Sequence, residues 1–171
     1  MSLAVIDVRD LVGHPGISRE ETLHGTLQGL ASELVRVPED APVTARLLLE
    51  SIVEGILVRG DLDGVWVFRC ARCLTECDSR FHLRVQELFE VAADPDSDGY
   101  ALDPDIGLDT EQMLRDAIGV EMPFSPLCRP DCLGLCETCG GNRNLDGCPG
   151  HEVADPRLAV LSQLSFPDTD A

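Results

Sequence analysis

The residues best suited to chemistry in this 171-residue chain are its eight cysteines, most of which stand in pairs with two or three residues between the partners. Cys70 and Cys73 form one C-x2-C pair, and Cys136 and Cys139 form a second. Zinc takes four ligands at the corners of a tetrahedron, and two cysteines at this spacing can hold one ion from a tight loop. In a reducing compartment, such pairs are more typical of metal ligands than of disulfides. The sequence therefore predicts structural zinc binding.

The second pair is part of a complete set of ligands. Cys148 follows Cys139 after eight intervening residues, and His151 comes three positions later, which gives the spacing C-x2-C-x8-C-x2-H. The segment is rich in glycine and poor in apolar residues, so a bound metal would supply the core that the segment lacks. We expect one zinc site on Cys136, Cys139, Cys148 and His151.

The first pair needs two further ligands, and Cys128 and Cys132 are the remaining candidates, at C-x3-C spacing. Our first partition joins these two cysteines to Cys70 and Cys73, so that the metal would staple a β-rich part to the C-terminal segment. A competing partition leaves Cys70 and Cys73 with the last two ligands of the chain. It would place on a single ion Cys128, Cys132, Cys136 and Cys139. The spacing alone leaves both partitions open, and with them the number of ions, one or two.

Other chemistries find less support in the residues. Cys77 is left over and is interpreted as an ordinary small side chain. A thioredoxin-like redox role is disfavoured because neither C-x-x-C pair opens a helix after a strand. Catalytic zinc would need an open coordination position and a nearby carboxylate as general base. Glu137 and Asp131 lie near the cysteines, but acidic residues are common throughout this chain. His14 and the other two histidines, His24 and His82, belong to no catalytic or metal-binding pattern.

The charge of the chain limits its partners. Thirty-one acidic against thirteen basic residues give a formal net charge of -18, which opposes direct binding to the phosphate backbone of nucleic acids and favours basic partners. Asp7, Arg9 and Asp10 stand where a signal peptide needs an unbroken apolar run. The most apolar stretch, residues 47–58, contains two glutamates and is shorter than the ~20 residues of a membrane-spanning helix. We expect a cytoplasmic protein that does not enter membranes.

Alternating apolar residues predict the strands that position the first cysteine pair. Residues 43–58 suggest one long strand or two short ones, with a shared face made by Leu47, Leu49, Val53 and Leu57. Residues 60–64 (GDLDG) predict a turn, residues 65–68 a second strand, and residues 81–91 a third. Residues 1–42 are weakly patterned and suggest loop with one strand or short helix. Cys70 and Cys73 are thus expected between two strands.

Helix signals lie further along the chain. Asp109 can cap a helix with Gln112 at its third position, while Leu108 meets Met113 as a hydrophobic staple, and the helix should end before Pro123. A second helix is expected from Asp155. The fold class predicted is α+β, an antiparallel sheet with a few helices and a zinc-bound, cysteine-rich C-terminal segment. We expect a single domain over residues 1–151, followed by a C-terminal helix and tail at 152–171. Within the domain we expect a β-rich part (43–93), an acidic loop (94–107), a helix (108–122) and the cysteine-rich segment (128–151).

Five blocks of the chain carry a family resemblance: LESIVEGILVRGDLDGVWVFRCARCL at 49–74, ELF at 87–89, LDTEQMLRDAIGVEMPFSPLC at 108–128, CLGLCETCGGNRN at 132–144 and DPRLAVLSQL at 155–164. On these blocks, about two thirds of the chain resembles the YceD family. The family's C-x-R-C-L motif falls on Cys70, Arg72, Cys73 and Leu74. Its DPR motif falls on Asp155, Pro156 and Arg157.

The resemblance implies a non-catalytic role in the accumulation, processing or stability of large-subunit ribosomal RNA. It also implies a partnership in ribosome assembly, and the acidity of this chain favours a basic ribosomal protein or a pre-ribosomal particle as the direct partner, with contact to the ribosomal RNA indirect. Family members differ in how many cysteines they retain, which implies that zinc is structural here. Two alternatives remain open: a zinc-dependent hydrolase acting on RNA, and a zinc-stabilised protein-interaction module.

Overall fold

The computed structural model describes residues 5–91, 99–103 and 107–145, together with residues 148, 151 and 157. In this part of the chain, strands β2, β4, β5, β6 and β7 lie side by side in that order, and β3 pairs with β5 off this path to complete a six-stranded sheet. Strands β1 and β8 form a separate two-stranded ribbon. The elements are β1 (Val5–Ile6), β2 (Ser18–Gly25), β3 (Val35–Arg36), β4 (Val43–Ser51), β5 (Gly55–Arg69), β6 (Glu76–Glu90), β7 (Tyr100–Ala101), β8 (Leu108–Asp109) and α1 (Thr110–Glu121).

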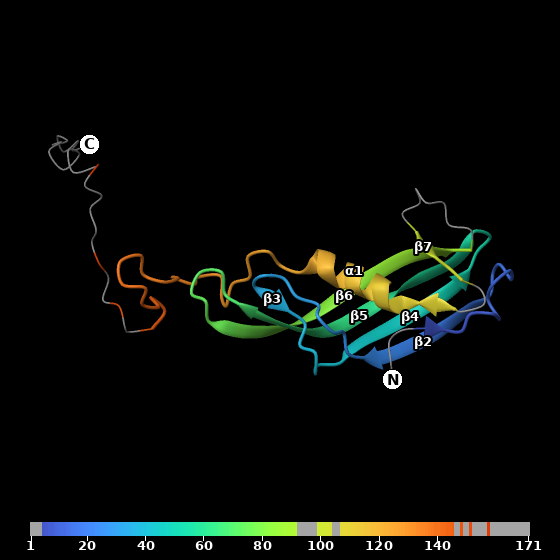
Figure 1. Ribbon diagram of the computed structural model, residues 1–171, viewed down its shortest axis with the longest axis horizontal. Helices are drawn as coiled ribbons and strands as arrows, with labels where there is room; N and C mark the ends of the chain where they lie inside the picture. Colours follow the sequence, from blue (N-terminus) through green and yellow to red (C-terminus); the bar gives the residue numbers. More distant parts are fainter. Residues whose placement is uncertain are drawn as a thin grey trace, which may run out of the picture.

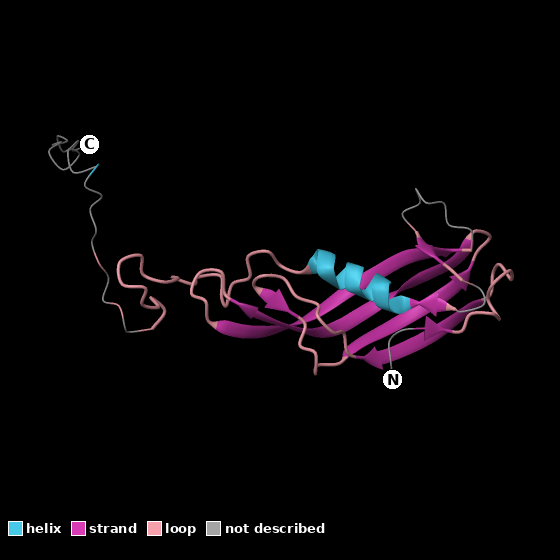
Figure 2. Cartoon of the chain, viewed as in Figure 1, coloured by secondary structure: helices cyan, strands magenta, loops and turns pink. Residues whose placement is uncertain are grey.

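The sheet is antiparallel apart from the pair β6 and β7, which is parallel. Helix α1 lies over one face of the sheet (Figure 1), and the cartoon in Figure 2 shows how strongly strands dominate. This arrangement is consistent with the expected α+β class. Among the described residues there is one α-helix rather than a few, and the helix predicted from Asp155 lies outside them.

The core lies between the sheet and α1. Alternate residues of β4 are buried, and the helix contributes Met113, Leu114 and Ile118, all without solvent exposure. Because successive side chains of a strand point to opposite faces, the same strands present charged residues on the other face of the sheet. The residues of β4 and β5 that bury fully are Val43, Ala45, Leu49, Ile56, Val58 and Leu62.

The turn predicted at residues 60–64 is wrong, because this segment runs through the middle of β5. Strands β4 and β5 instead turn at residues 52–54, and Val53 is 84% exposed rather than on the buried face. A Cβ added to Gly60 would lie 2.0 Å from the backbone oxygen of Arg46, and one added to Gly64 would lie 2.3 Å from the Phe81 ring. Both glycines therefore serve close approach between strands, which explains why a turn-like composition occurs inside a strand.

The first 42 residues hold more structure than their sequence suggested. Strand β2 pairs along its full length with β4, and short strands β1 and β3 flank it in the sequence. The buried side chains of this region are Ile6, Val8, Leu11, Leu27, Val35 and Val37. They lie in short groups, and no group extends into an alternation long enough to predict a strand.

The predicted acidic loop at 94–107 contains a strand. Tyr100 and Ala101 form β7, and the Tyr100 ring stacks on Phe89 with 5.1 Å between the ring centroids. Residues 92–98 and 104–106 lie outside the described part. The helix predicted from Asp109 is confirmed: the Asp109 side chain accepts a hydrogen bond from the Glu111 backbone N–H, and the helix ends at Glu121. Gln112 donates to Asp116.

The cysteine-rich segment lies at one end of the elongated sheet. Figure 1 shows the chain leaving α1, running to the turn between β5 and β6, and extending past it. A small buried cluster of Cys70, Cys73 and Cys132 forms there, separate from the main core. No helix in the described part of the chain combines the length and apolar character needed to cross a lipid bilayer.

Candidate metal centres

The turn between β5 and β6 positions the first cysteine pair, as the sequence predicted. Cys70 follows the last residue of β5, and its backbone N–H donates to the carbonyl of Thr75 at 2.9 Å. The Leu74 N–H donates to the carbonyl of Cys70 at 2.9 Å, and Leu74 takes a positive φ of 58°. The tight turn leaves the side chains of Cys70 and Cys73 buried, with exposed fractions of 0% and 5%.

The C-terminal segment docks onto this turn through its backbone. The Ala71 N–H donates to the Pro126 carbonyl at 2.8 Å, and the Leu135 N–H donates to the Arg72 carbonyl at 3.0 Å. The Arg72 guanidinium adds a bond from Nη1 to the Cys132 carbonyl at 3.0 Å. These bonds bring the segment that carries Cys128 and Cys132 against the turn. Arg72 thus lies between Cys70 and Cys73 in the sequence, and its side chain binds the backbone of a third cysteine, Cys132.

Four sulfurs meet at this junction, and we call Cys70, Cys73, Cys128 and Cys132 the first centre. Their Sγ atoms all lie within 4.8 Å of one another. The Cys70 and Cys132 sulfurs are 3.8 Å apart, and the Cys73 and Cys128 sulfurs are 3.7 Å apart. Sulfurs placed 2.3 Å from one tetrahedral ion lie about 3.8 Å from one another. The donor set and its spacing therefore fit a four-thiolate metal site.

The surroundings of the first centre favour negative charge on two of its sulfurs. Burial opposes ionisation of Cys70, but backbone N–H groups of Cys128 and Cys73 lower its pKa to about 6. The Thr75 hydroxyl, 3.3 Å from the Cys73 sulfur, lowers the pKa of Cys73. Burial and the neighbouring thiols of Cys132 and Cys73 raise the pKa of Cys128 to about 12. Four thiolates this close repel one another, and a cation would relieve that repulsion.

The second centre comprises Cys136, Cys139, Cys148 and His151, whose ligand atoms also lie within 4.8 Å of one another. A narrow loop carries the first two: the Cys136 N–H donates to the Gly141 carbonyl at 2.7 Å, and the Gly140 N–H donates back to the Cys136 carbonyl at 2.8 Å. Gly140 takes a positive φ of 69°, which favours glycine. The Cys139 and Cys148 sulfurs are 3.6 Å apart.

The second centre is more open than the first. Cys136 is buried, whereas Cys139 and His151 are exposed. Backbone N–H groups of Cys139 and Thr138 lower the pKa of Cys136 to about 6. One thiolate is thus formed readily at neutral pH, and the exposed histidine can supply a neutral nitrogen ligand.

The structure groups the eight predicted ligands as in our first partition, and the competing partition does not match this grouping. Metal binding itself stays a prediction. Cys77 belongs to neither group in the described part of the chain; it lies on β6, packs against the main core and has a pKa raised mainly by burial. The other histidines make local contacts: His14 with the Val12 carbonyl, His24 with the Thr44 hydroxyl, and His82 with the Asp63 carboxylate.

Three polar residues beside the sulfurs were not identified from the sequence. The Asn144 amide nitrogen lies 3.3 Å from the Cys132 sulfur, and Asn142 donates to the Thr75 hydroxyl at 3.3 Å. No spacing rule selects an amide or a hydroxyl as the neighbour of a metal ligand. The close sequence position of Asn142 and Asn144, directly after the second C-x2-C pair, was the one available signal.

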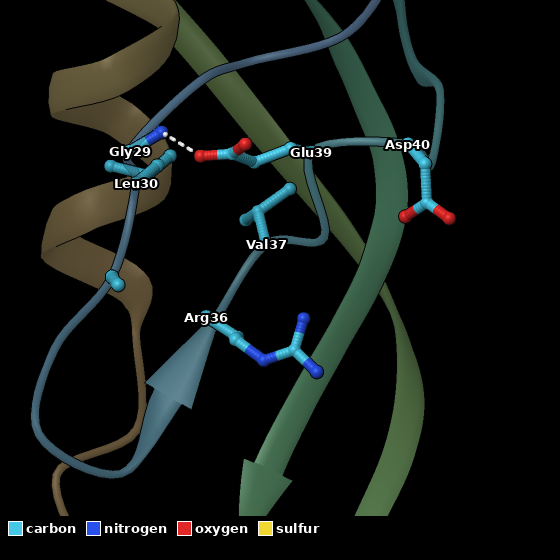
Figure 3. A pocket seen from close by; sticks show the side chains of 7 residues that line it. Gly29, Leu30, Arg36, Val37, Glu39 and Asp40 are labelled. Atoms are coloured by element: carbon cyan, nitrogen blue, oxygen red, sulfur yellow. Dashed lines mark hydrogen bonds between the residues drawn. The ribbon is translucent and has the colours of Figure 1, made fainter.

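A surface hollow away from the cysteines lies between residues 29–31 and residues 36–40. It measures about 360 Å³, and Figure 3 shows Arg36, Glu39 and Asp40 on its walls. The Glu39 carboxylate accepts a hydrogen bond from the Gly29 backbone N–H at 3.1 Å, which ties the loop together. The Glu39 carboxylate thus stabilises the loop, and Arg36 pairs with Glu76 on β6 at 3.8 Å, so the cysteine centres remain the candidate functional site.

Comparison with known proteins agrees with the sequence resemblance. A family model described as "Large ribosomal RNA subunit accumulation protein YceD" matches residues 58–165. An uncharacterised protein of Mycobacterium tuberculosis is 38% identical over 176 residues, covering 96% of this chain and 83% of that protein. One from Mycobacterium leprae is 34% identical over 177 residues, covering 98% and 80%. A maize protein named "Large ribosomal RNA subunit accumulation protein YCED homolog 1, chloroplastic" is 43% identical over 37 residues, covering 22% of this chain and 13% of that protein. No solved structure matches the chain.

Proposed function

Because this chain belongs to the YceD family, we propose that it is a non-catalytic factor in biogenesis of the large ribosomal subunit, supporting the accumulation of large-subunit ribosomal RNA through its processing or stability. The observation that carries the proposal is the family match over residues 58–165, a range that contains every ligand of both centres. The cysteine-rich end of the molecule therefore lies within the part of the chain that defines the family.

Zinc is the ion we propose for both centres. Thiolates are soft ligands that select zinc over magnesium or calcium, and the sulfur separations of 3.7 and 3.8 Å in the first centre suit a tetrahedral ion. When bound, zinc would supply a positive charge shared by four thiolates in the first centre, and by three thiolates and one imidazole in the second. The chain's own contribution is positional: the turn after β5 and the Arg72 contact to Cys132 present the sulfurs together.

A structural role for the ion follows from the number of ligands. Each centre offers four protein ligands, which fill the coordination sphere of a tetrahedral ion. A catalytic zinc requires an open position for water or substrate, and neither centre leaves one. The nearby carboxylates are poorly placed as general bases. Asp131 is 82% exposed in its side chain and pairs with Arg129 at 3.4 Å, and Glu137 is exposed. These features favour a non-catalytic factor over a zinc hydrolase acting on RNA.

The direct partner we propose is a basic ribosomal protein or a pre-ribosomal particle that contains one. A chain with a net charge of -18 repels the phosphate backbone and attracts Arg- and Lys-rich surfaces. Contact with ribosomal RNA would then be indirect. Purified chain should bind isolated large-subunit ribosomal proteins in a salt-sensitive manner. A tight, salt-insensitive complex with naked ribosomal RNA would contradict this part of the proposal.

The proposed role can be tested in cells that lack the chain. We expect the ratio of large-subunit to small-subunit ribosomal RNA to fall on depletion and to recover when the wild-type chain is supplied. A double variant, Cys70→Ser with Cys73→Ser, should restore the ratio poorly, because it removes half of the first centre. Cys77→Ser is the matched control, since this cysteine lies in neither centre of the described structure.

An unchanged ratio of the two ribosomal RNAs after depletion would refute the role in ribosome biogenesis. Full rescue by the double variant at normal protein level would be compatible with the role in ribosome biogenesis, but it would show that the first centre is not needed for that role.

A further inference from the structure

The two centres are joined by one short hairpin, which we define as residues 132–144. Leu135 and Asn142 face each other across it as an isolated β-bridge, and the Arg143 N–H donates to the Gly134 carbonyl at 2.9 Å. Cys136 lies near its tip, where it serves the second centre, while Cys132 lies at its base, where it serves the first. The hairpin therefore has one centre at each end.

Asn144 fixes the base of the hairpin to the first centre. Its amide nitrogen contacts the Cys132 sulfur at 3.3 Å and donates to the Asn142 side-chain oxygen at 2.8 Å. Its amide oxygen accepts from the Leu133 N–H at 2.9 Å and from the Arg129 guanidinium at 2.8 Å. A side-chain amide has two donors and two acceptor positions, so every hydrogen bond that Asn144 can make is used here.

Asn142 extends the same network to the opposite sulfur pair. Its amide nitrogen donates to the Thr75 hydroxyl at 3.3 Å, and that hydroxyl lies 3.3 Å from the Cys73 sulfur. The side-chain oxygen of Asn142 also accepts from the backbone N–H of Asn144 at 3.0 Å. A chain of hydrogen bonds thus runs from Cys73 to Cys132 through two asparagines of the returning strand of the hairpin.

From this geometry we infer that Asn142 and Asn144 couple the two centres, so that an ion in the first centre raises the affinity of the second centre for its own ion. This inference rests on the proposed metal binding and adds that filling of one centre regulates the affinity of the other. With an ion bound, Cys132 would be held as a thiolate, and hydrogen bonds to charged sulfur are stronger than bonds to a neutral thiol. The asparagines are then held, and the ordering of the hairpin is already achieved when the second ion arrives.

The order of filling follows from burial. The first centre lies on a folded sheet with three of its four ligands buried, whereas the second centre has an exposed cysteine and an exposed histidine. The strand that carries Asn142 and Asn144 also leads on toward Cys148 and His151. We therefore expect the first centre to fill first and the second to follow.

Cobalt(II) titration of the metal-free full chain under reducing conditions tests this coupling. Four thiolates and three thiolates with one imidazole give different visible spectra, so the two centres can be followed separately. We expect Cys70→Ser with Cys73→Ser to weaken the second centre by about tenfold or more. Asn144→Ala should weaken the second centre by a similar factor, because it removes the hydrogen bond through which the hairpin is held to Cys132. Arg143→Ala, a change to an exposed side chain between the two asparagines, should leave it unchanged.

A second measurement guards against variants that fail to fold. Coupling between sites is reciprocal, so Cys136→Ser with Cys139→Ser must weaken the first centre by the same factor while altering only the tip of the hairpin. If each centre binds cobalt equally well whether or not the other is intact, the coupling is refuted although metal binding stands. If neither centre of the wild-type chain binds cobalt, both the metal proposal and the coupling fail.

Discussion

Removing metal with a chelator should free the cysteine-rich segment from the sheet while the sheet itself stays folded. The reason is that the buried residues form two separate clusters: a large one between the sheet and α1, and a small one around Cys70, Cys73 and Cys132. The small cluster adds only Leu127 and Leu135 as aliphatic side chains. If both centres hold ions as proposed, their loss would remove what holds the small cluster and leave the large one unchanged.

The magnitude follows from the contacts at the junction. Four hydrogen bonds join the segment to the turn: Ala71 to Pro126, Leu135 to Arg72, Arg72 to Cys132, and Asn142 to Thr75. At about 1 kcal/mol each they contribute roughly 4 kcal/mol. Ordering the segment from residue 123 to 145 costs several times as much, since each ordered residue costs about 1–2 kcal/mol. The hydrogen bonds alone therefore cannot hold the segment in place, whereas a structural zinc contributes about 10–16 kcal/mol.

Hydrogen exchange with and without chelator is the assay. In the metal-loaded chain the backbone N–H groups of Ala71 and Leu135 should be protected, and chelation should lower that protection by at least about a thousandfold, the effect expected for an ion present at only 1,000 times its dissociation constant. Amides in the ladder between β4 and β5 should keep their protection. The reasoning is refuted if Leu135 stays protected in chelator, or if the β4–β5 ladder loses protection in step with it.

Three further outcomes are expected. Gly60→Ala should destabilise the chain by about 3 kcal/mol in urea denaturation, because its Cβ would meet the backbone of Arg46, whereas Gly119→Ala on α1, where a Cβ meets nothing within 4 Å, should stabilise it by about 0.5–1 kcal/mol. Metal affinity of the first centre should fall about tenfold per pH unit on acidification for each proton that the ion displaces. The raised pKa of Cys128, about 12, keeps this thiol protonated until the ion binds. Calorimetry in buffers of different ionisation enthalpy measures the protons released on binding, and a release of none would contradict this prediction. Cys77→Ser should leave the metal content per chain unchanged by elemental analysis, and loss of an ion would place this residue in a centre.

The two C-x2-C pairs could be predicted from the sequence because local spacing determines them. Two cysteines separated by two residues belong to one turn in nearly any fold, so Cys70 with Cys73 and Cys136 with Cys139 needed no tertiary information. The cap at Asp109 is a local signal in the same sense. The choice between the two partitions needed the fold, because it depends on which segments meet at the end of the β5–β6 hairpin.

The predictions that failed depended on contacts between distant strands. A glycine inside a turn and a glycine inside a strand look alike in the sequence, and only the oxygen of Arg46 beside Gly60 distinguishes them. The one strand or short helix expected within residues 1–42 was not placed on β2, because β2 lies at the edge of the sheet, where its side chains are only half buried and carry no apolar alternation. The amides of Asn142 and Asn144 were missed because their role exists only once Cys132 is in place.

The separation of the small cysteine cluster from the large apolar core has a consequence for how the family can diverge. The strands β4, β5 and β6 and the helix α1 bury their own residues without help from the cysteines. A lineage could therefore shorten or lose the cysteine-rich end and still inherit a folded sheet. Natural selection would then act on that end only through its function, and not through the stability of the sheet. Substitutions at the cysteines should accumulate independently of substitutions in the core, so sequence drift in one region leaves the other free to change.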